Sequence, residues 1–385
     1  MVKRTILSLL LMLYMSTGFS QATDSTLKVF SISGYVKELP YLQLIPDHTS
    51  NFDNILNLRL NLAANLLQST RVVLELRNRL MFGDAGWGEL ASDESFRKGD
   101  GWLDLSVASE AGGRRGLVHL MADRFYLEHN RGKWQVRAGR QRINWGINMV
   151  SNPNDLFNTY SFFDFDYPER PGSDAVRVQY YRNEMSHAEV AFAPADHISD
   201  AVGAFLYGFN FKGYDVQLIG GYYHNRLALG GGWAGHIRGT GFKGEATVFD
   251  DPDGSAKPDI VASVSVDYLF QDGLYIFMEG LYNGGYVDMG EQILNLSKSL
   301  SADNILFSTY AVTTSVSYPF SPVFNGNLAF MMLPDINSLF ISPSLSYSVL
   351  TNFDVSLISQ IYGSPGKSND RGIAIALIGN LQWSF

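Results

Sequence analysis

The chain has 385 residues, of which 13% are aromatic and only 17% charged, with no cysteine and a formal net charge of −9. The negative charge argues against nucleic acid as a partner. Without cysteine the protein can be neither disulfide-bonded nor lipidated at a leading cysteine. Beyond the N-terminal region no apolar run approaches the ~18 residues of a membrane-spanning helix, so helical membrane spans are excluded. Composition alone still allows two soluble domains.

A signal peptide is predicted at the N-terminus. Lys3 and Arg4 precede the apolar run Ile6–Met15, and small residues follow as far as Ser20. A membrane-spanning helix needs ~20 apolar residues, so a retained anchor is the weaker alternative. We therefore expect residues 1–20 to be removed. Residues 21–385 contain no long-period repeat, low-complexity tract or linker, and this favours a single domain.

Alternating residues predict strands early in the mature chain. In Asn54–Ala64 four leucines fall on one face and polar residues such as Arg59 on the other, because successive strand side chains point to opposite faces. Arg71–Leu80 repeats the pattern after a short turn at Gln68–Thr70, which predicts a hairpin with one aliphatic and one charged face. A soluble sandwich would alternate as well, so alternation by itself does not identify a membrane protein.

The lengths of the connections separate the two possibilities. Short and long connections alternate along the chain, as they do in bacterial outer-membrane barrels. The short ones are expected at Gln68–Thr70, Asn130–Lys133, Arg182–Met185, Lys212–Gly213, Arg238–Thr240, Gln271–Gly273, Tyr318–Pro322 and Leu350–Thr351. The long ones are expected at Glu38–Asp53, Met81–Gly116, Trp145–Ser173, Asp250–Pro258, Asn283–Asn304 and Gly363–Arg371.

These connections predict an all-β fold, a transmembrane antiparallel up-and-down β-barrel of about 18 strands with both termini in the periplasm. Sixteen strands are also possible. Two stretches leave the strand number open: Trp102–Ser109, which could be a strand or part of a loop, and the glycine-rich Leu227–Ile237.

Arginine is concentrated in the first half of the mature chain. From Asn183 onward only Arg226, Arg238 and Arg371 occur, so one wall of the barrel should be rich in arginine. The side chains that we expect to line the pore are Arg59, Glu75, Arg77, Arg79, Arg124, Tyr126, Arg137, Arg140, Arg142 and Arg177.

A hairpin around Arg131-Gly132 gives this wall a definite register. Strict alternation beyond it would turn Arg140 and Arg142 toward lipid, at a cost of ~2 to 4 kcal/mol each. We therefore expect a bulge at Gly139; an exit from the membrane near Gly139 is the alternative. The predicted pairs are Glu128 with Gln135, Tyr126 with Arg137, and Arg124 with Gly139.

An arginine wall favours anions, because fixed positive charge raises the local anion concentration in confined water. Inward-facing acids would neutralise part of that charge. Selection of anions and simple filling of the lumen by paired charges are both open. The acids expected to face inward are Glu75, Glu128, Glu189, Glu245 and Glu279.

Three neighbouring motifs carry a resemblance to a known family. Asp123–Glu128 (DRFYLE), Trp134–Gly146 (WQVRAGRQRINWG) and Asn152–Asp155 (NPND) resemble outer-membrane porins related to the alginate-export barrel. The resemblance covers about fifty residues in the middle third of the chain. It implies an 18-stranded porin with an arginine-lined lumen and an inward-folded loop, and it does not imply a polyanionic polysaccharide as substrate.

The segment Trp145–Ser173 is too aromatic for a freely solvated loop. We expect it to pack into the lumen as a constriction, and a cap over the extracellular rim is the alternative. The residues expected to form the constriction are Asn152, Pro153, Asn154, Asp155, Asp164 and Asp166.

The last strand, Gly372–Phe385, has aliphatic residues at mid-length and Trp383 and Phe385 at its end on one face, as lipid and then the membrane interface require. A terminal aromatic of this kind resembles the signal read by the barrel-assembly machinery, which we expect as a partner beside outer-membrane lipid. A closing strand of a soluble sandwich is the alternative.

Other functional motifs are weak. The seven histidines are scattered and form no recognised catalytic motif with serine or aspartate. Asp251-Pro252-Asp253-Gly254 lacks the remainder of a calcium loop and reads as a turn, and Gly230-Gly231-Gly232 reads as a strand kink. We therefore expect no metal, no cofactor and no enzymatic activity, but a porin for small hydrophilic, possibly anionic solutes. A barrel enzyme acting at the rim and a closed structural or secretion-complex barrel are the alternatives.

Overall fold

The computed structural model describes residues 29–44, 50–93, 101–159, 172–254, 257–286, 300–364 and 372–385. The predicted signal peptide, residues 1–20, lies outside these residues and stays a prediction.

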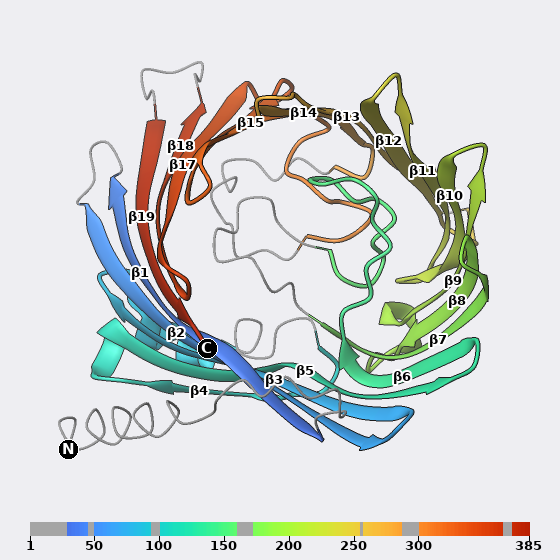
Figure 1. Ribbon diagram of the computed structural model, residues 1–385, viewed down its shortest axis with the longest axis horizontal. Helices are drawn as coiled ribbons and strands as arrows, with labels where there is room; N and C mark the ends of the chain where they lie inside the picture. The colour runs from blue at the N-terminus through green and yellow to red at the C-terminus, as the bar shows by residue number, and fades with distance from the viewer. Residues whose placement is uncertain are drawn as a thin grey trace.

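The described chain forms one closed antiparallel barrel (Figure 1). Apart from β4, each strand pairs with the next one along the chain, β3 pairs with β5, and β1 pairs with β19 to close the ring. Eighteen strands make up the barrel, and β4 is an additional short strand, so the predicted fold class and strand number are confirmed. The strands are β1 (Phe30–Leu44), β2 (Asn51–Leu67), β3 (Thr70–Gly83), β4 (Ser106–Glu110), β5 (Gly116–Arg131), β6 (Trp134–Gln141), β7 (Ser173–Asn183), β8 (Ser186–Ala193), β9 (Val202–Phe211), β10 (Tyr214–Tyr223), β11 (Arg226–Ile237), β12 (Thr240–Asp250), β13 (Asp259–Leu269), β14 (Tyr275–Asn283), β15 (Tyr310–Ser321), β16 (Phe324–Leu333), β17 (Ser338–Leu350), β18 (Phe353–Ser364) and β19 (Gly372–Ser384).

Helical structure in the described residues is limited to short 3-10 turns, η2 (Trp87–Ser92), η3 (Gly113–Arg115) and η4 (Ile198–Asp200). No helix among the described segments has the length and apolar character needed to cross a membrane.

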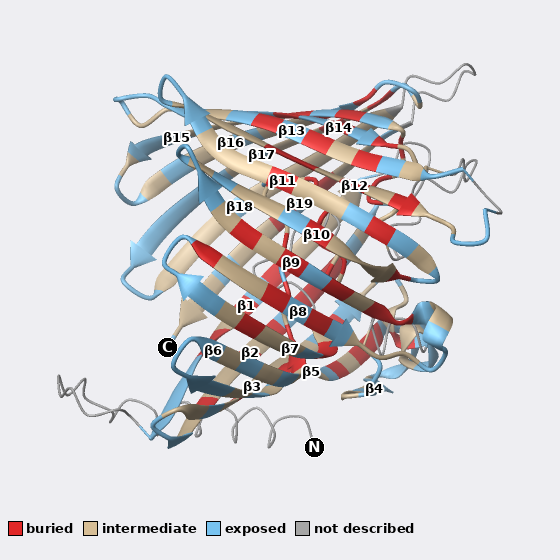
Figure 2. Cartoon of the chain, turned by 90° about the vertical axis from the view of Figure 1, so that its right-hand side faces the viewer, coloured by how far each residue is buried: buried red, intermediate tan, exposed pale blue. Residues whose placement is uncertain are grey.

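The barrel carries its apolar side chains outside. On β2, Leu56 is 39% exposed, whereas Asn57 and Arg59 are each 1% exposed. On β19, Leu377 and Leu381 are exposed and Ile378 is completely buried. Figure 2 shows this alternation of exposed and buried residues along tilted strands. An apolar outer face around a polar interior is the arrangement of a barrel surrounded by lipid.

Several predicted connections were wrong in length. Glu38–Asp53 is mostly strand, because β1 and β2 stay paired from Phe30↔Ala64 to Gln43↔Asn51, and each further pair satisfies more backbone groups. In the same way β15 continues to Ser321, through most of the predicted turn Tyr318–Pro322. Three short connections were not predicted, and they lie at the same end of the barrel as the predicted long loops: 194–201, 224–225 and 334–337.

The ambiguous stretch Trp102–Ser109 contains part of β4. The short strand β6 pairs with β5 only over Phe125–Arg131, and β4 pairs with the remaining part of β5, Leu117–Met121. β4 therefore completes the barrel wall where β6 does not reach. The second ambiguous stretch, Leu227–Ile237, belongs to strand β11.

The register of the β5–β6 hairpin differs from the prediction by two residues. Glu128 pairs with Arg137 and Tyr126 with Gly139, because the turn consists of Gly132 and Lys133. In Gly132 the backbone has a φ of 59°, which suits glycine. A shift by an even number keeps each side chain on its face, so Tyr126, Glu128 and Arg137 remain on the predicted inward face.

The expected bulge at Gly139 is absent from the pairings of β6, which run without a shift from Trp134 to Arg140 on both sides. Instead β5 is bulged at Asp123, between the pairs Glu75↔Arg124 and Leu76↔Ala122. The chain leaves the wall after β6, so Arg142 lies beyond the strand.

Arg140 avoids lipid in another way. Alternation places it on the outward face, yet it is only 2% exposed. Its guanidinium is 2.7 Å from Asp174 of β7 and donates to the carbonyl of Leu103, in the segment that leads into β4. The ion pair is thus covered by a distant part of the chain, which removes the cost of exposing a charge to lipid.

Candidate functional site

A cluster of charged side chains lies on the inner face of β2, β3 and β5. Arg59 donates to Asp123 at 2.6 Å and also to Glu75, and Arg77 is 3.0 Å from the same Asp123. Arg124 donates to the carbonyl of Asp123 at 2.9 Å. The structure therefore brings together four of the predicted pore-lining residues around one buried acid. Asp123 was not among the predicted site residues; the bulge turns it inward, and alternation cannot reveal a bulge.

A second set follows on β5 to β8. Arg137 pairs with Glu128 and lies 5.3 Å from the centre of the Tyr126 ring. Arg177 binds Glu189 through two hydrogen bonds of 2.6 and 2.7 Å. Each of these arginines thus has a carboxylate partner on a neighbouring strand.

Other predicted residues have different surroundings. Arg79 is 2.8 Å from Nδ1 of His119, and Arg142 donates to Asn144 at 3.2 Å. Arg140 faces away from the lumen, in its covered pair with Asp174, and its predicted pore-lining position is wrong. The wall is therefore rich in arginine, and several of its arginines have carboxylate partners.

The chain between β6 and β7 turns into the barrel. Figure 1 shows this segment inside the ring of strands (green). Along residues 143–159 it is mostly buried, and Trp145 donates from its indole to Glu189 at 2.5 Å while its carbonyl accepts from Gln217 of β10. We call residues 143–159 the lumen loop.

Two buried acids on the opposite wall hold the lumen loop by its backbone. Glu245 on β12 accepts from the amides of Ile147 (3.1 Å), Asn148 (2.9 Å) and Asn154 (3.2 Å). Glu279 on β14 accepts from two more loop amides, at 3.3 and 2.8 Å. Each of these two carboxyl groups accepts from two or more loop amides at once, so together they fix the path of the loop.

The predicted constriction motif takes part in this anchoring. Asn154 is completely buried, Asn152 and Asp155 are 6% and 1% exposed, and the carbonyl of Pro153 accepts from Thr247 at 3.0 Å. These residues pack against the barrel wall, where they hold the loop in place. The remaining two, Asp164 and Asp166, lie outside the described residues.

A second inward segment, residues 300–309, was not predicted. Ala302, Ile305 and Leu306 are 0%, 7% and 4% exposed, and the amide of Ala302 donates to the Tyr223 hydroxyl at 2.9 Å. It is the orange segment inside the barrel in Figure 1. A signal for it was available: apolar residues at these positions do not suit a solvated loop.

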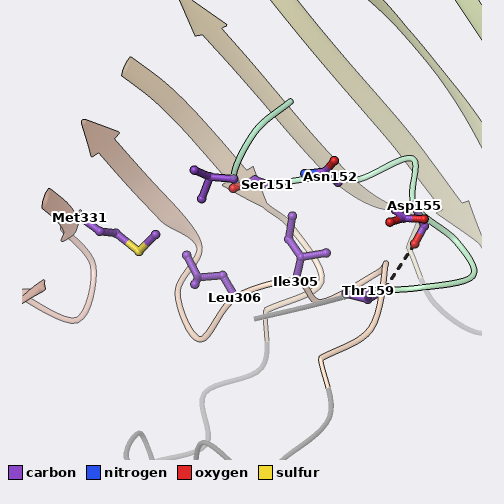
Figure 3. Close-up of a pocket in the computed structure, with 8 residues that line it drawn as sticks. Ser151, Asn152, Asp155, Thr159, Ile305, Leu306 and Met331 are labelled. Carbon is purple, nitrogen blue, oxygen red and sulfur yellow. Dashed lines mark hydrogen bonds between the residues drawn. The ribbon is translucent and has the colours of Figure 1, made fainter. Parts of the chain in front are cut away.

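The two inward segments meet at a small cavity. Figure 3 shows Ile305 and Leu306 close to Ser151 and Thr159 of the lumen loop. The cavity has a volume of about 20 Å³, enough for roughly one water molecule. The segments therefore support one another inside the lumen.

The 300–309 segment is tied to the wall at both sides. Asn283 donates to the carbonyls of Leu306 (2.7 Å) and Ser308 (3.1 Å). Asp335, in the β16–β17 connection, accepts from Ser308 and from the amide of Thr309. Burial raises the pKa of Asp335, but these hydrogen bonds outweigh it and hold the pKa below its ordinary value.

Replacing Asn283 with alanine should release this segment. Each lost hydrogen bond contributes ~1 kcal/mol, and two carbonyls would be left without their donor. We expect new protease cleavage within residues 300–309 of the folded barrel. The matched control is Asn327→Ala on β16, whose side chain bonds only to Ser315 and Ser317 among the contacts described. Equal protease resistance in both variants would show that Asn283 does not hold the segment.

The histidines contribute no catalytic arrangement that the structure describes. His119 contacts Arg79, and His129 contacts the Thr70 hydroxyl at 2.9 Å. Within the described segments no group of three or more histidine, aspartate or glutamate side chains could hold a metal ion.

Comparison with known proteins finds similarity in structure alone. No family model matches the sequence, and no curated protein matches it either. Solved structures that resemble the barrel include Pseudomonas aeruginosa OpdL, with a TM-score of 0.57, 10% identity and coverage of 93% of this chain and 99% of that one. Pseudomonas aeruginosa OpdQ (TM-score 0.56, 6% identity, 93% and 99% coverage) and Acinetobacter baumannii OccAB4 (0.55, 10%, 94% and 99%) are similar.

These similar structures are outer-membrane porins, and at 6% to 10% identity the similarity establishes the fold alone. They do not support the specific resemblance to the alginate-export barrels that the motifs between Asp123 and Asp155 suggested. In the structure the first motif lies in β5, the second covers β6, and the third belongs to the lumen loop.

Proposed function

We propose that the protein is a porin of a Gram-negative outer membrane, which lets small hydrophilic solutes diffuse through its lumen with a preference for anions. Both termini would lie in the periplasm, so the turns such as Lys212–Gly213 would be periplasmic and the lumen loop would enter from outside. The solutes, outer-membrane lipid and the barrel-assembly machinery, through Phe385, would be its partners.

The observation that carries this proposal is the relation between the arginine wall and the lumen loop. The loop is fixed to β12 and β14 by Glu245 and Glu279, and the strands that carry the arginine cluster, β2, β3 and β5, lie on the other side of the barrel (Figure 1). A solute that passes the loop must therefore move along a wall rich in arginine, and fixed positive charge favours anions in confined water.

Liposome swelling tests the proposal. Proteoliposomes should swell in neutral sugars and faster in organic anions of the same size. Absence of swelling with every solute would contradict a porin and favour a closed structural barrel.

A further inference from the structure

An apolar groove lies on the outer face of the barrel, on β10, β11 and β12. It has a volume of about 510 Å³ and is lined by Val216, Leu218, Gly231, Trp233 and Ala246, with Phe211 and Tyr214 at one end. The strand pairings place Leu218, Gly231 and Ala246 side by side in one row and Val216, Trp233 and Gly244 in the next. Two small residues beside Leu218 thus form the floor, and Trp233 forms one side.

The glycines of this region differ in what covers them. A Cβ on Gly235 would meet the Tyr214 ring at 2.2 Å, and one on Gly244 would meet the Trp233 ring at 2.4 Å, so these two positions are filled by aromatic side chains of the protein. The nearest side-chain atom to a Cβ on Gly231 is a Leu218 methyl at 3.6 Å. The groove above Gly231 is therefore left for a molecule from outside.

Two basic residues lie at the same end of these strands. Lys212 and Arg238 occupy the exposed turns β9–β10 and β11–β12, with φ angles of 51° and 52°. Leu218 lies six residues along the strand from Lys212. At ~3.3 Å per residue and a tilt of ~40° this is a height of roughly 15 Å, about half of the ~30 Å hydrocarbon core. The groove and the basic turns thus span one membrane leaflet.

We propose that this face binds one anionic glycerophospholipid, with an acyl chain in the groove above Gly231 and Ala246 and the phosphate between Lys212 and Arg238. The groove faces the hydrocarbon region, where acyl chains surround the protein, and the two cations complement a phosphate at the headgroup level. The site rests on the proposed orientation, which places these turns in the periplasmic, phospholipid leaflet.

Native mass spectrometry of the delipidated full-length barrel, titrated with phosphatidylglycerol, tests the site. We expect one lipid per barrel to be retained, with at least tenfold weaker binding in K212Q/R238Q and in A246L, whose larger side chain fills the groove. The matched controls should bind as the unaltered barrel does: R131Q/K133Q in another turn at the same end, and A138L on the outer face of β6.

Heat-modified electrophoretic mobility shows that each variant is folded before its binding is compared. Equal phosphatidylglycerol retention in all variants would overturn the site. Tighter retention of lipopolysaccharide than of phosphatidylglycerol at the same residues would overturn the assignment to the phospholipid leaflet. Ion conductance of the same variants reports on the porin separately, because the groove lies outside the lumen.

Discussion

Replacing Glu245 with alanine is expected to raise the single-channel conductance and make it noisier. The variant removes the acceptor of three backbone amides, at Ile147, Asn148 and Asn154. Each hydrogen bond contributes ~0.5 to 1.5 kcal/mol, so the lumen loop should lose much of its attachment while Glu279 retains part of it. Planar-bilayer recording of single barrels measures the effect.

The matched control for this variant is Asp267→Asn on the adjacent strand β13. Asp267 also faces the lumen, but it pairs with Lys243 at 3.1 Å, not with the loop. Its conductance should stay close to that of the unaltered barrel. If Glu245→Ala conducts as quietly as this control, the carboxylate does not hold the loop.

Replacing Asp123 with alanine should destabilise the barrel strongly. The Arg59 side chain is 1% exposed and Arg77 is 18% exposed, and both contact this carboxylate. Removing one partner of a buried ion pair costs ~3 to 5 kcal/mol, because the remaining charge stays buried. The urea midpoint of unfolding should fall, and the anion preference of folded barrels should increase because one negative charge has left the wall.

An exposed ion pair serves as the control for the buried ion pairs of Asp123. Asp84 lies 3.9 Å from Arg115, and both side chains are exposed, at 46% and 81%. Such pairs contribute ~0 to 1 kcal/mol, so Asp84→Ala should leave the urea midpoint almost unchanged. Equal midpoints for the two variants would mean that the buried cluster around Asp123 contributes no stability.

The sequence predicted which side chains face inward better than it predicted their partners. Leu56 and Arg59 were assigned to the correct faces because alternation depends only on odd and even spacing. The β5–β6 register was wrong by two residues, and no facing pattern could reveal this, since an even shift leaves the pattern unchanged.

Features that depend on distant backbone could not be read from the sequence. Glu245 was correctly predicted to face inward. Its partners are backbone amide groups, and because every residue except proline has one, the sequence could not identify them. Alternation places Arg140 toward lipid, so the sequence predicted a bulge that would turn it inward. The structure instead covers Arg140 with the segment around Leu103, which is distant in the chain. The bulge occurs at Asp123, where the local sequence contains no glycine to mark it.

The reversal potential in a KCl gradient across a planar bilayer tests the central claim most directly. A barrel with an arginine-rich lumen wall should conduct and should show the sign of chloride preference, and neutralising Arg79, Arg124 and Arg142 together should reduce that preference. A barrel that carries no current, or one that prefers potassium, would contradict the proposed anion-preferring porin.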